Sequence, residues 1–170
     1  MLKGVLRLVS TALCCAAIYF FFTGWVNVSG QEMISSIGSI FDIEIPSSFT
    51  VDNLRKMAES LNDLGDDLRL KALYYYAWSL YLIPALSIIC ILMMLMKKAG
   101  FGVFSSVINF LLVAVFIAGV FYAENYIQQE LNKSVFGSFV GFGGILHLTN
   151  TPWYLLGLMA TNTVVSRLAK

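Results

Sequence analysis

Four long segments of mainly apolar residues constrain the fold of this chain more than any other feature. A helix needs about 20 such residues to cross the roughly 30 Å hydrocarbon layer of a bilayer. Residues 72–96 and 101–123 meet this requirement without a charged residue, and residues 5–26 contain only Arg7 near their start. Residues 148–167 form a fourth, more polar segment. We therefore predict a single membrane domain that is all-α, a bundle of four transmembrane helices.

The residues at the ends of the first and fourth segments are typical of membrane-spanning helices. No small-x-small cleavage site follows the first segment, so we expect an uncleaved span rather than a secretory signal. Trp25 stands where an interfacial aromatic anchor belongs. Pro152 follows Thr151, which fits a proline in the first turn behind a capping hydroxyl.

The charged residues divide between the two sides that four spans would create. One side has no acidic residue and six basic ones: Lys3, Arg7, Lys97, Lys98, Arg167 and Lys170. The other side, with outer loops 27–71 and 124–147, has all ten acidic residues and five basic ones. Because basic residues mark the cytoplasmic side, we expect both termini in the cytoplasm of a plasma membrane or bacterial inner membrane. The net charge of +1 gives no electrostatic case for nucleic acid.

The first outer loop is long enough to be partly folded. Residues 41–45 alternate like a short strand, and Ser48 or Thr50 can cap a helix that follows. One face of that helix is apolar, which suits either a cover for the protein's own surface or a docking face for a partner. The candidate partner residues on this face are Leu54, Met57, Leu61, Leu64 and Leu68.

The second outer segment begins as a helical extension of the third span, from Glu124 to Asn132. The glycine-rich stretch that follows, around 135–147, is re-entrant, interfacial or part of the fourth span. Within it, Gly137 and Gly141 have the spacing at which membrane helices pack closely, so they are further candidates for a partner interface.

Polar and sulfur-containing residues inside the spans have structural or pore-lining interpretations. Asn109, Thr161 and Asn162 suit hydrogen bonds between helices, or the lining of a pore built from several copies. Ala114, Ala118 and Gly119 predict a close-packing face on the third span. We interpret Cys14, Cys15 and Cys90 as packing residues, since a thiol in apolar surroundings behaves as a small hydrophobe.

The sequence has no pattern typical of catalysis, a cofactor or a metal centre. The only histidine, His147, is expected near the outer interface, and no carboxylate lies within a span. We therefore expect a non-catalytic structural, accessory or assembly subunit whose partners are lipid, other membrane subunits or further copies of itself. The alternative is an oligomeric channel or pore for ions or small solutes.

Overall fold

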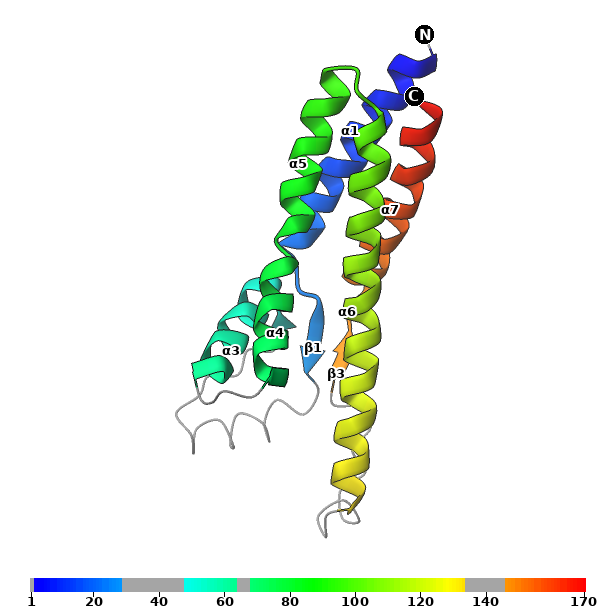
Figure 1. Ribbon diagram of the computed structural model, residues 1–170. Coiled ribbons are helices and arrows are strands. Elements are labelled where there is room, and N and C mark those ends of the chain that lie inside the picture. Colours follow the sequence, from blue (N-terminus) through cyan, green and yellow to red (C-terminus); the bar gives the residue numbers. More distant parts are fainter. Residues whose placement is uncertain (1, 29–47, 64–67, 134–145) are drawn as a thin grey trace.

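The computed structural model describes residues 2–28, 48–63, 68–133 and 146–170 (Figure 1). These residues are mostly helical, with three short strands. The helices are α1 (Leu2–Phe21), α3 (Val51–Asp63), α4 (Leu68–Ser79), α5 (Leu82–Leu95), α6 (Gly100–Lys133) and α7 (Asn150–Leu168). The strands are β1 (Val26–Val28), β2 (Ser48–Phe49) and β3 (Leu146–Leu148).

Helices α1, α5, α6 and α7 pack side by side as a bundle (Figure 1). Among the described residues, three helices are long and apolar enough to cross a membrane: Leu2–Phe21, Lys71–Leu95 and Gly100–Asn125. They correspond to the first three predicted spans. Helix α7 matches the fourth predicted segment in position, but it is not among these candidates, so the count of four spans is not confirmed.

Both chain ends and the turn between α5 and α6 lie at one end of the bundle (Figure 1). The Lys3 ammonium donates a hydrogen bond to the Lys170 backbone oxygen at 3.1 Å. The turn closes as a Schellman motif, because the backbone N–H groups of Lys97 and Lys98 return to the carbonyls of Met94 and Met93. Lys97 has φ 62°, a left-handed conformation that glycine adopts more easily than lysine.

The second of the three candidate spans, Lys71–Leu95, runs through two helices that are interrupted between Ser79 and Leu82. Helix α4 stops at Ser79, and α5 starts at Leu82 as a second helix. The cause is Pro84, which has no N–H to donate to the carbonyl of Leu80, four residues earlier. That carbonyl instead accepts from Ile83 N–H at 3.0 Å, in a tighter turn. The break separates α5, in the bundle, from α4, which lies beside the sheet (Figure 1).

A three-stranded antiparallel sheet closes the other end of the bundle, so the fold is mostly helical with a small sheet rather than all-α throughout. The strand order is β2-β1-β3, with Val26 opposite both Phe49 and Leu148. Since β1 follows α1 and β3 precedes α7, the sheet ties these two helix ends together. The strand predicted at residues 41–45 lies outside the described residues.

The first helix ends at Phe21 rather than at Val26, because the chain turns into β1. Trp25, at this turn, is fully buried and is not an exposed interfacial anchor as predicted. Its ring makes edge-to-face contacts with Phe21 and Phe116, at centroid distances of 6.1 and 4.9 Å. The indole N–H donates to the Phe21 carbonyl at 3.2 Å. Trp25 thus joins the bundle core to the sheet.

Helix α3 starts as predicted, with the Thr50 hydroxyl accepting a hydrogen bond from Asn53 N–H at 3.3 Å. Val51 and Ala58 are buried, and Leu54 packs partly buried against the core. We call the sheet, α3 and α4 together the cap. Helix α6 continues well past the sheet, as the predicted extension of the third span requires (Figure 1).

Candidate functional site

A network of buried polar side chains joins α1, α6 and α7 in the bundle. Its centre is Asn162, whose amide oxygen accepts from the Ser10 hydroxyl at 2.6 Å and from the Ser166 hydroxyl at 3.5 Å. The amide nitrogen donates to Ser106 Oγ at 2.6 Å and to Cys14 Sγ at 3.4 Å. All five side chains are at most 2 % exposed. We call Ser10, Ser106, Asn162 and Ser166 the polar core.

The polar core accounts for part of the polarity of α7, whereas Asn150, Thr161 and Arg167 are polar and exposed. Asn162 and Ser166 make α7 polar in sequence, yet both direct their polar groups toward α1 and α6. In an apolar solvent such groups are tolerated only when their hydrogen bonds are made within the protein. A hydropathy window counts these residues as polar although they expose nothing polar to the surroundings.

Asn109 makes a second buried polar contact, between α6 and α5. Its amide nitrogen donates to the Ile83 carbonyl at 3.2 Å and to Ser87 Oγ at 3.4 Å. The Asn109 amide oxygen has no hydrogen-bond partner among the described residues. Thr161, the third polar residue singled out in the sequence, is exposed on α7. The structure therefore places Asn109 and Asn162 between helices and Thr161 on the outer surface of the bundle.

Charged and aromatic side chains attach α3 to the junction of α4 and α5. The Asp52 carboxylate accepts hydrogen bonds from the Tyr81 hydroxyl at 3.1 Å, Arg55 at 3.0 Å and Lys56 at 2.9 Å. The Arg55 guanidinium lies over the Trp78 ring, 5.1 Å from its centroid, within cation–π range. The ammonium of Lys56, followed by Arg55, lowers the pKa of Asp52 from 3.8 to about 2.

We expect the attachment of α3 to weaken in acid. Because the folded pKa of Asp52 lies below its ordinary value, the stabilisation is complete above pH 3.8 and is lost as the pH falls toward about 2. Its size should stay below about 1 kcal/mol, because the carboxylate is half exposed and screened. The measurement is tryptophan fluorescence between pH 6 and 2, where wild type should show a transition that Asp52→Asn lacks. An identical transition in both proteins would contradict the assignment.

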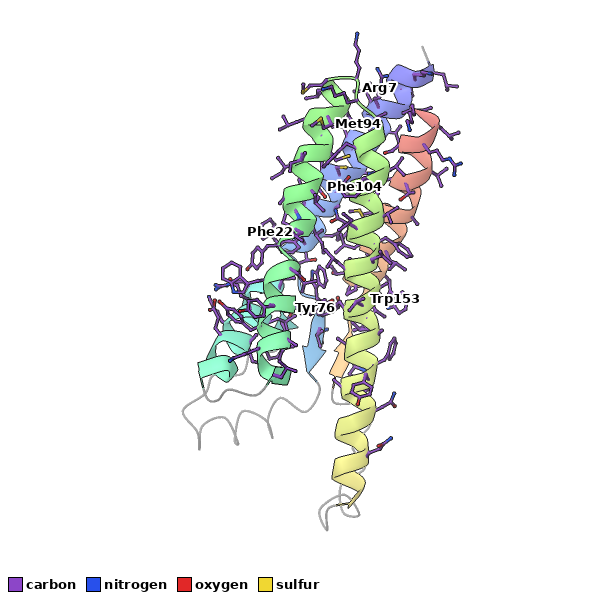
Figure 2. The ribbon with its side chains drawn as sticks, viewed as in Figure 1. Arg7, Phe22, Tyr76, Met94, Phe104 and Trp153 are labelled. Atoms are coloured by element: carbon purple, nitrogen blue, oxygen red, sulfur yellow. The ribbon has the colours of Figure 1, made fainter. Side chains whose placement is uncertain are left out.

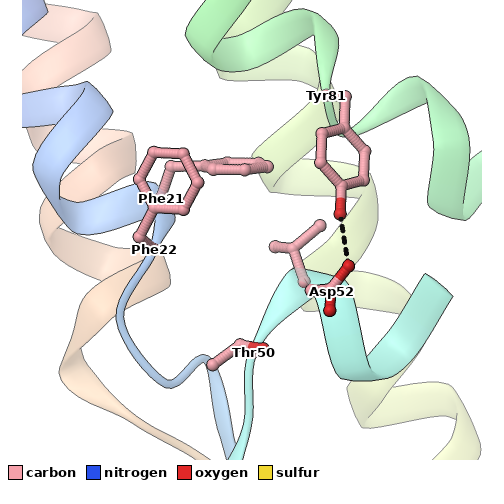
Figure 3. A pocket seen from close by; sticks show the side chains of 6 residues that line it. Phe21, Phe22, Thr50, Asp52 and Tyr81 are labelled. Atoms are coloured by element: carbon pink, nitrogen blue, oxygen red, sulfur yellow. Dashed lines mark hydrogen bonds between the residues drawn. The ribbon is translucent and has the colours of Figure 1, made fainter. Parts of the chain in front are cut away.

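A small pocket lies where α1, α3 and α5 meet, shown in Figure 3. Phe21, Phe22 and Val51 give it apolar walls, and the hydrogen bond from Tyr81 to Asp52 crosses one side. Its volume of about 60 Å³ is room for roughly two water molecules. Pockets for small organic ligands are several times larger, about 300–1,000 Å³. We interpret it as a packing gap beside the cap.

The residues predicted for a partner interface fall into three groups. Leu54 contributes to the protein's own core. Met57 and Leu68 are 52 % and 81 % exposed. Leu64, Gly137 and Gly141 lie outside the described residues, as does the side chain of Leu61.

Two glycines on the outer surface of the bundle were not singled out as a pair in the sequence. A methyl group added at Gly119 on α6 or at Gly157 on α7 would meet no described atom within 4 Å. Ala118 is exposed as well, whereas Ala114 is partly buried, so part of the predicted close-packing face of the third span is uncovered among the described residues. Spacing identifies small residues on a helix, but only the fold shows whether another helix of the same chain covers them.

The cysteines differ in their surroundings. Cys14 and Cys90 are buried, as predicted for packing residues, whereas Cys15 is exposed and so does not pack in the core. His147 is exposed on β3. In the part of the chain that the structure describes, no three His, Cys, Asp or Glu side chains are grouped so as to hold a metal ion.

Comparison with protein-family models, with curated proteins and with solved structures found no match to this chain. Its function is therefore inferred from its own geometry.

Proposed function

We propose that the chain is a four-span membrane protein, with α7 as the fourth span. Its 19 residues give α7 a length of about 28 Å, close to the thickness of the hydrocarbon layer. It packs along α1 and α6, both apolar enough to cross a membrane, from the sheet to the end that holds the termini (Figure 1). A helix packed beside two spans over this length shares their depth, and the hydrogen bonds of the polar core offset the cost of burying Asn162 and Ser166.

Aromatic side chains support a membrane boundary near the junction of the bundle and the cap. Phe22, Trp78 and Trp153, from three separate segments, are 45–67 % exposed. Figure 2 shows Phe22, Tyr76 and Trp153 around this junction. Tryptophan and tyrosine prefer the interface between lipid and water. The cap would then lie on the outer side, and the termini with the Lys97–Lys98 turn in the cytoplasm, as the charge distribution favours.

Within this topology, we propose that the protein is a non-catalytic assembly subunit that binds another membrane protein or a second copy of itself. The observation that carries this proposal is the open surface at Gly119 and Gly157. Glycine inside a helix is less favourable than alanine by about 0.5–1 kcal/mol, and membrane helices use it where a second backbone approaches closely. Exposed Met57 and Leu68 on the cap add apolar surface for the same partner.

The test places a photo-activated crosslinking residue at position 157 in α7 and, separately, at Leu92 in α5. Leu92 is 53 % exposed and lies on a different helix of the bundle, so it serves as the matched control. In the native membrane, position 157 should give one discrete crosslinked product and position 92 only diffuse ones. Gly157→Leu should reduce by about tenfold the complex recovered in mild detergent, because a bulky side chain blocks close helix approach. A monomer without a discrete product at position 157 would overturn the assembly proposal.

The alternative function is an oligomeric pore. Asn109 and Asn162 are engaged between helices of one bundle, so a pore between copies would have to be lined by Thr161, which faces outward. Ion or solute flux through liposomes containing the purified protein tests this alternative. Flux that Thr161→Leu abolishes would favour the pore.

A further inference from the structure

Three sulfur-containing side chains meet inside the bundle, and neither the polar core nor the proposed assembly surface uses them all. Cys14 comes from α1, while Cys90 and Met94 lie one helical turn apart on α5. All three are at most 2 % exposed and belong to one packed cluster. Cys14 and Cys90 lie where α1 packs against α5. Met94 extends the cluster toward the end of the bundle that holds the termini (Figure 2).

The surroundings of these sulfur atoms differ from a purely apolar core. Asn162 donates an N–H hydrogen bond to Cys14 Sγ at 3.4 Å. The buried Ser10 hydroxyl lies one helical turn before Cys14 on the same side of α1. Donors aimed at sulfur stabilise a thiolate, and such groups around metal-binding cysteines set the charge that a site can hold. Cys15, the next residue on α1, has no part in the cluster because it is exposed on the outer surface.

We propose that Cys14, Cys90 and Met94 form a binding site for copper(I). Copper(I) is a soft ion that selects thiolate and thioether ligands, which are the groups gathered here. Harder ions such as Mg²⁺ and Ca²⁺ prefer oxygen ligands and do not suit this set. Two cysteines on different helices would make the bound ion a cross-link between α1 and α5.

The charge balance is compatible with a site at membrane depth. When copper(I) binds and one thiol releases its proton, the net charge of the site does not change. This avoids the cost of an isolated charge in an apolar medium. Release of the second proton leaves one negative charge, which the Asn162 N–H that donates to Cys14 Sγ is placed to stabilise. Neither the ion nor the sulfur atoms change oxidation state in this step.

The test is competition for copper(I) between the purified full-length chain in detergent and the coloured chelator bicinchoninate. Wild type should take one copper(I) per chain from the chelator. Cys14→Ser and Cys90→Ser should each weaken binding at least tenfold, and Met94→Leu about three- to tenfold. Cys15→Ser is the matched control, with the same chemical change one residue away on the exposed face, and should bind within twofold of wild type.

A second measurement on wild type removes the dependence on variants that could fail to fold. Addition of copper(I) to wild type in weakly buffered detergent solution, followed with a pH indicator, gives the number of protons displaced per bound ion, which should be one or two. Three results would overturn the proposal. They are no uptake by wild type, loss of binding in Cys15→Ser with retention in Cys14→Ser, and uptake without any displaced proton.

Discussion

Trp25→Ala is expected to destabilise the cap by about 3–5 kcal/mol, the usual cost of removing a large buried aromatic side chain. Trp25 is fully buried between Phe21 and Phe116, so its loss leaves a cavity at the point where bundle and sheet meet. The Trp25 backbone also makes hydrogen bonds to the two neighbouring segments. Its N–H donates to the Phe49 carbonyl, and its carbonyl accepts from the Thr149 N–H. Loosening this residue therefore loosens all three strands.

The measurement is the free energy of unfolding of the purified protein in a denaturing-detergent titration, combined with trypsin cleavage after Arg55 and Lys56. Trp25→Ala should unfold at lower denaturant and be cut faster in α3. Trp153→Ala is the control, because this tryptophan is 47 % exposed and its loss should cost under about 1 kcal/mol. Equal effects of the two substitutions would show that Trp25 does not hold the cap.

Asn162→Ala is expected to destabilise the bundle by about 1–3 kcal/mol. The substitution leaves the buried hydroxyls of Ser10 and Ser106 without their amide partner. We expect the unpaired hydroxyls to cost about 1–3 kcal/mol in total. The cost stays in this range because each hydrogen bond between membrane helices contributes only about 0.6–2 kcal/mol. The loss should appear as easier separation of α7 from α1 and α6.

Thr161→Ala is the matched control for this second prediction, because Thr161 is adjacent in sequence but exposed. In the same denaturing-detergent titration it should change the free energy of unfolding by less than about 0.5 kcal/mol. If Asn162→Ala and Thr161→Ala behaved alike, the polar core would not stabilise the packing of α7.

Much of the helical framework could be predicted from the sequence. Residues 101–123 and the extension to Asn132 are apolar, then polar, without a helix breaker, and the structure has one helix from Gly100 to Lys133. The capping hydroxyl of Thr50 was predicted as one of two choices and is confirmed. On α7, Pro152 is in the first turn as expected, but the capping residue is Thr149, whose hydroxyl accepts from Thr151 N–H at 3.2 Å.

The missed features depend on contacts between distant segments. The strands have only two or three residues each, too few to show an alternating pattern. In the sequence, Trp25 stands at the end of an apolar segment, where interfacial anchors occur. In the structure it is buried because β2 and β3 pair with β1 beside it. Pro84 was visible in the sequence as a helix breaker, yet a proline inside an apolar segment also occurs in continuous membrane helices, where other groups satisfy the freed carbonyl.

For the candidate sites too, the sequence does not show which residues are buried and which are exposed. Asn109, Thr161 and Asn162 are equally polar in sequence, and only the packing of α5, α6 and α7 separates the two buried amides from the exposed hydroxyl. Cys14 and Cys15 are also neighbours in sequence, but they lie on different faces of α1. Cys14 is buried on the side of Cys90, and Cys15 is exposed.

The central claim is that α7 crosses the membrane, and the sidedness of its two ends tests this most directly. Single cysteines at His147, before α7, and at Lys170, after it, are introduced into a chain whose three native cysteines are replaced by alanine. Each is exposed to a maleimide that cannot cross the membrane, in intact cells and after permeabilisation. Four spans predict that the cysteine at 147 reacts in intact cells, whereas the cysteine at 170 reacts only after permeabilisation, as does a cysteine at Lys3. Reaction of positions 147 and 170 from the same side would contradict the account.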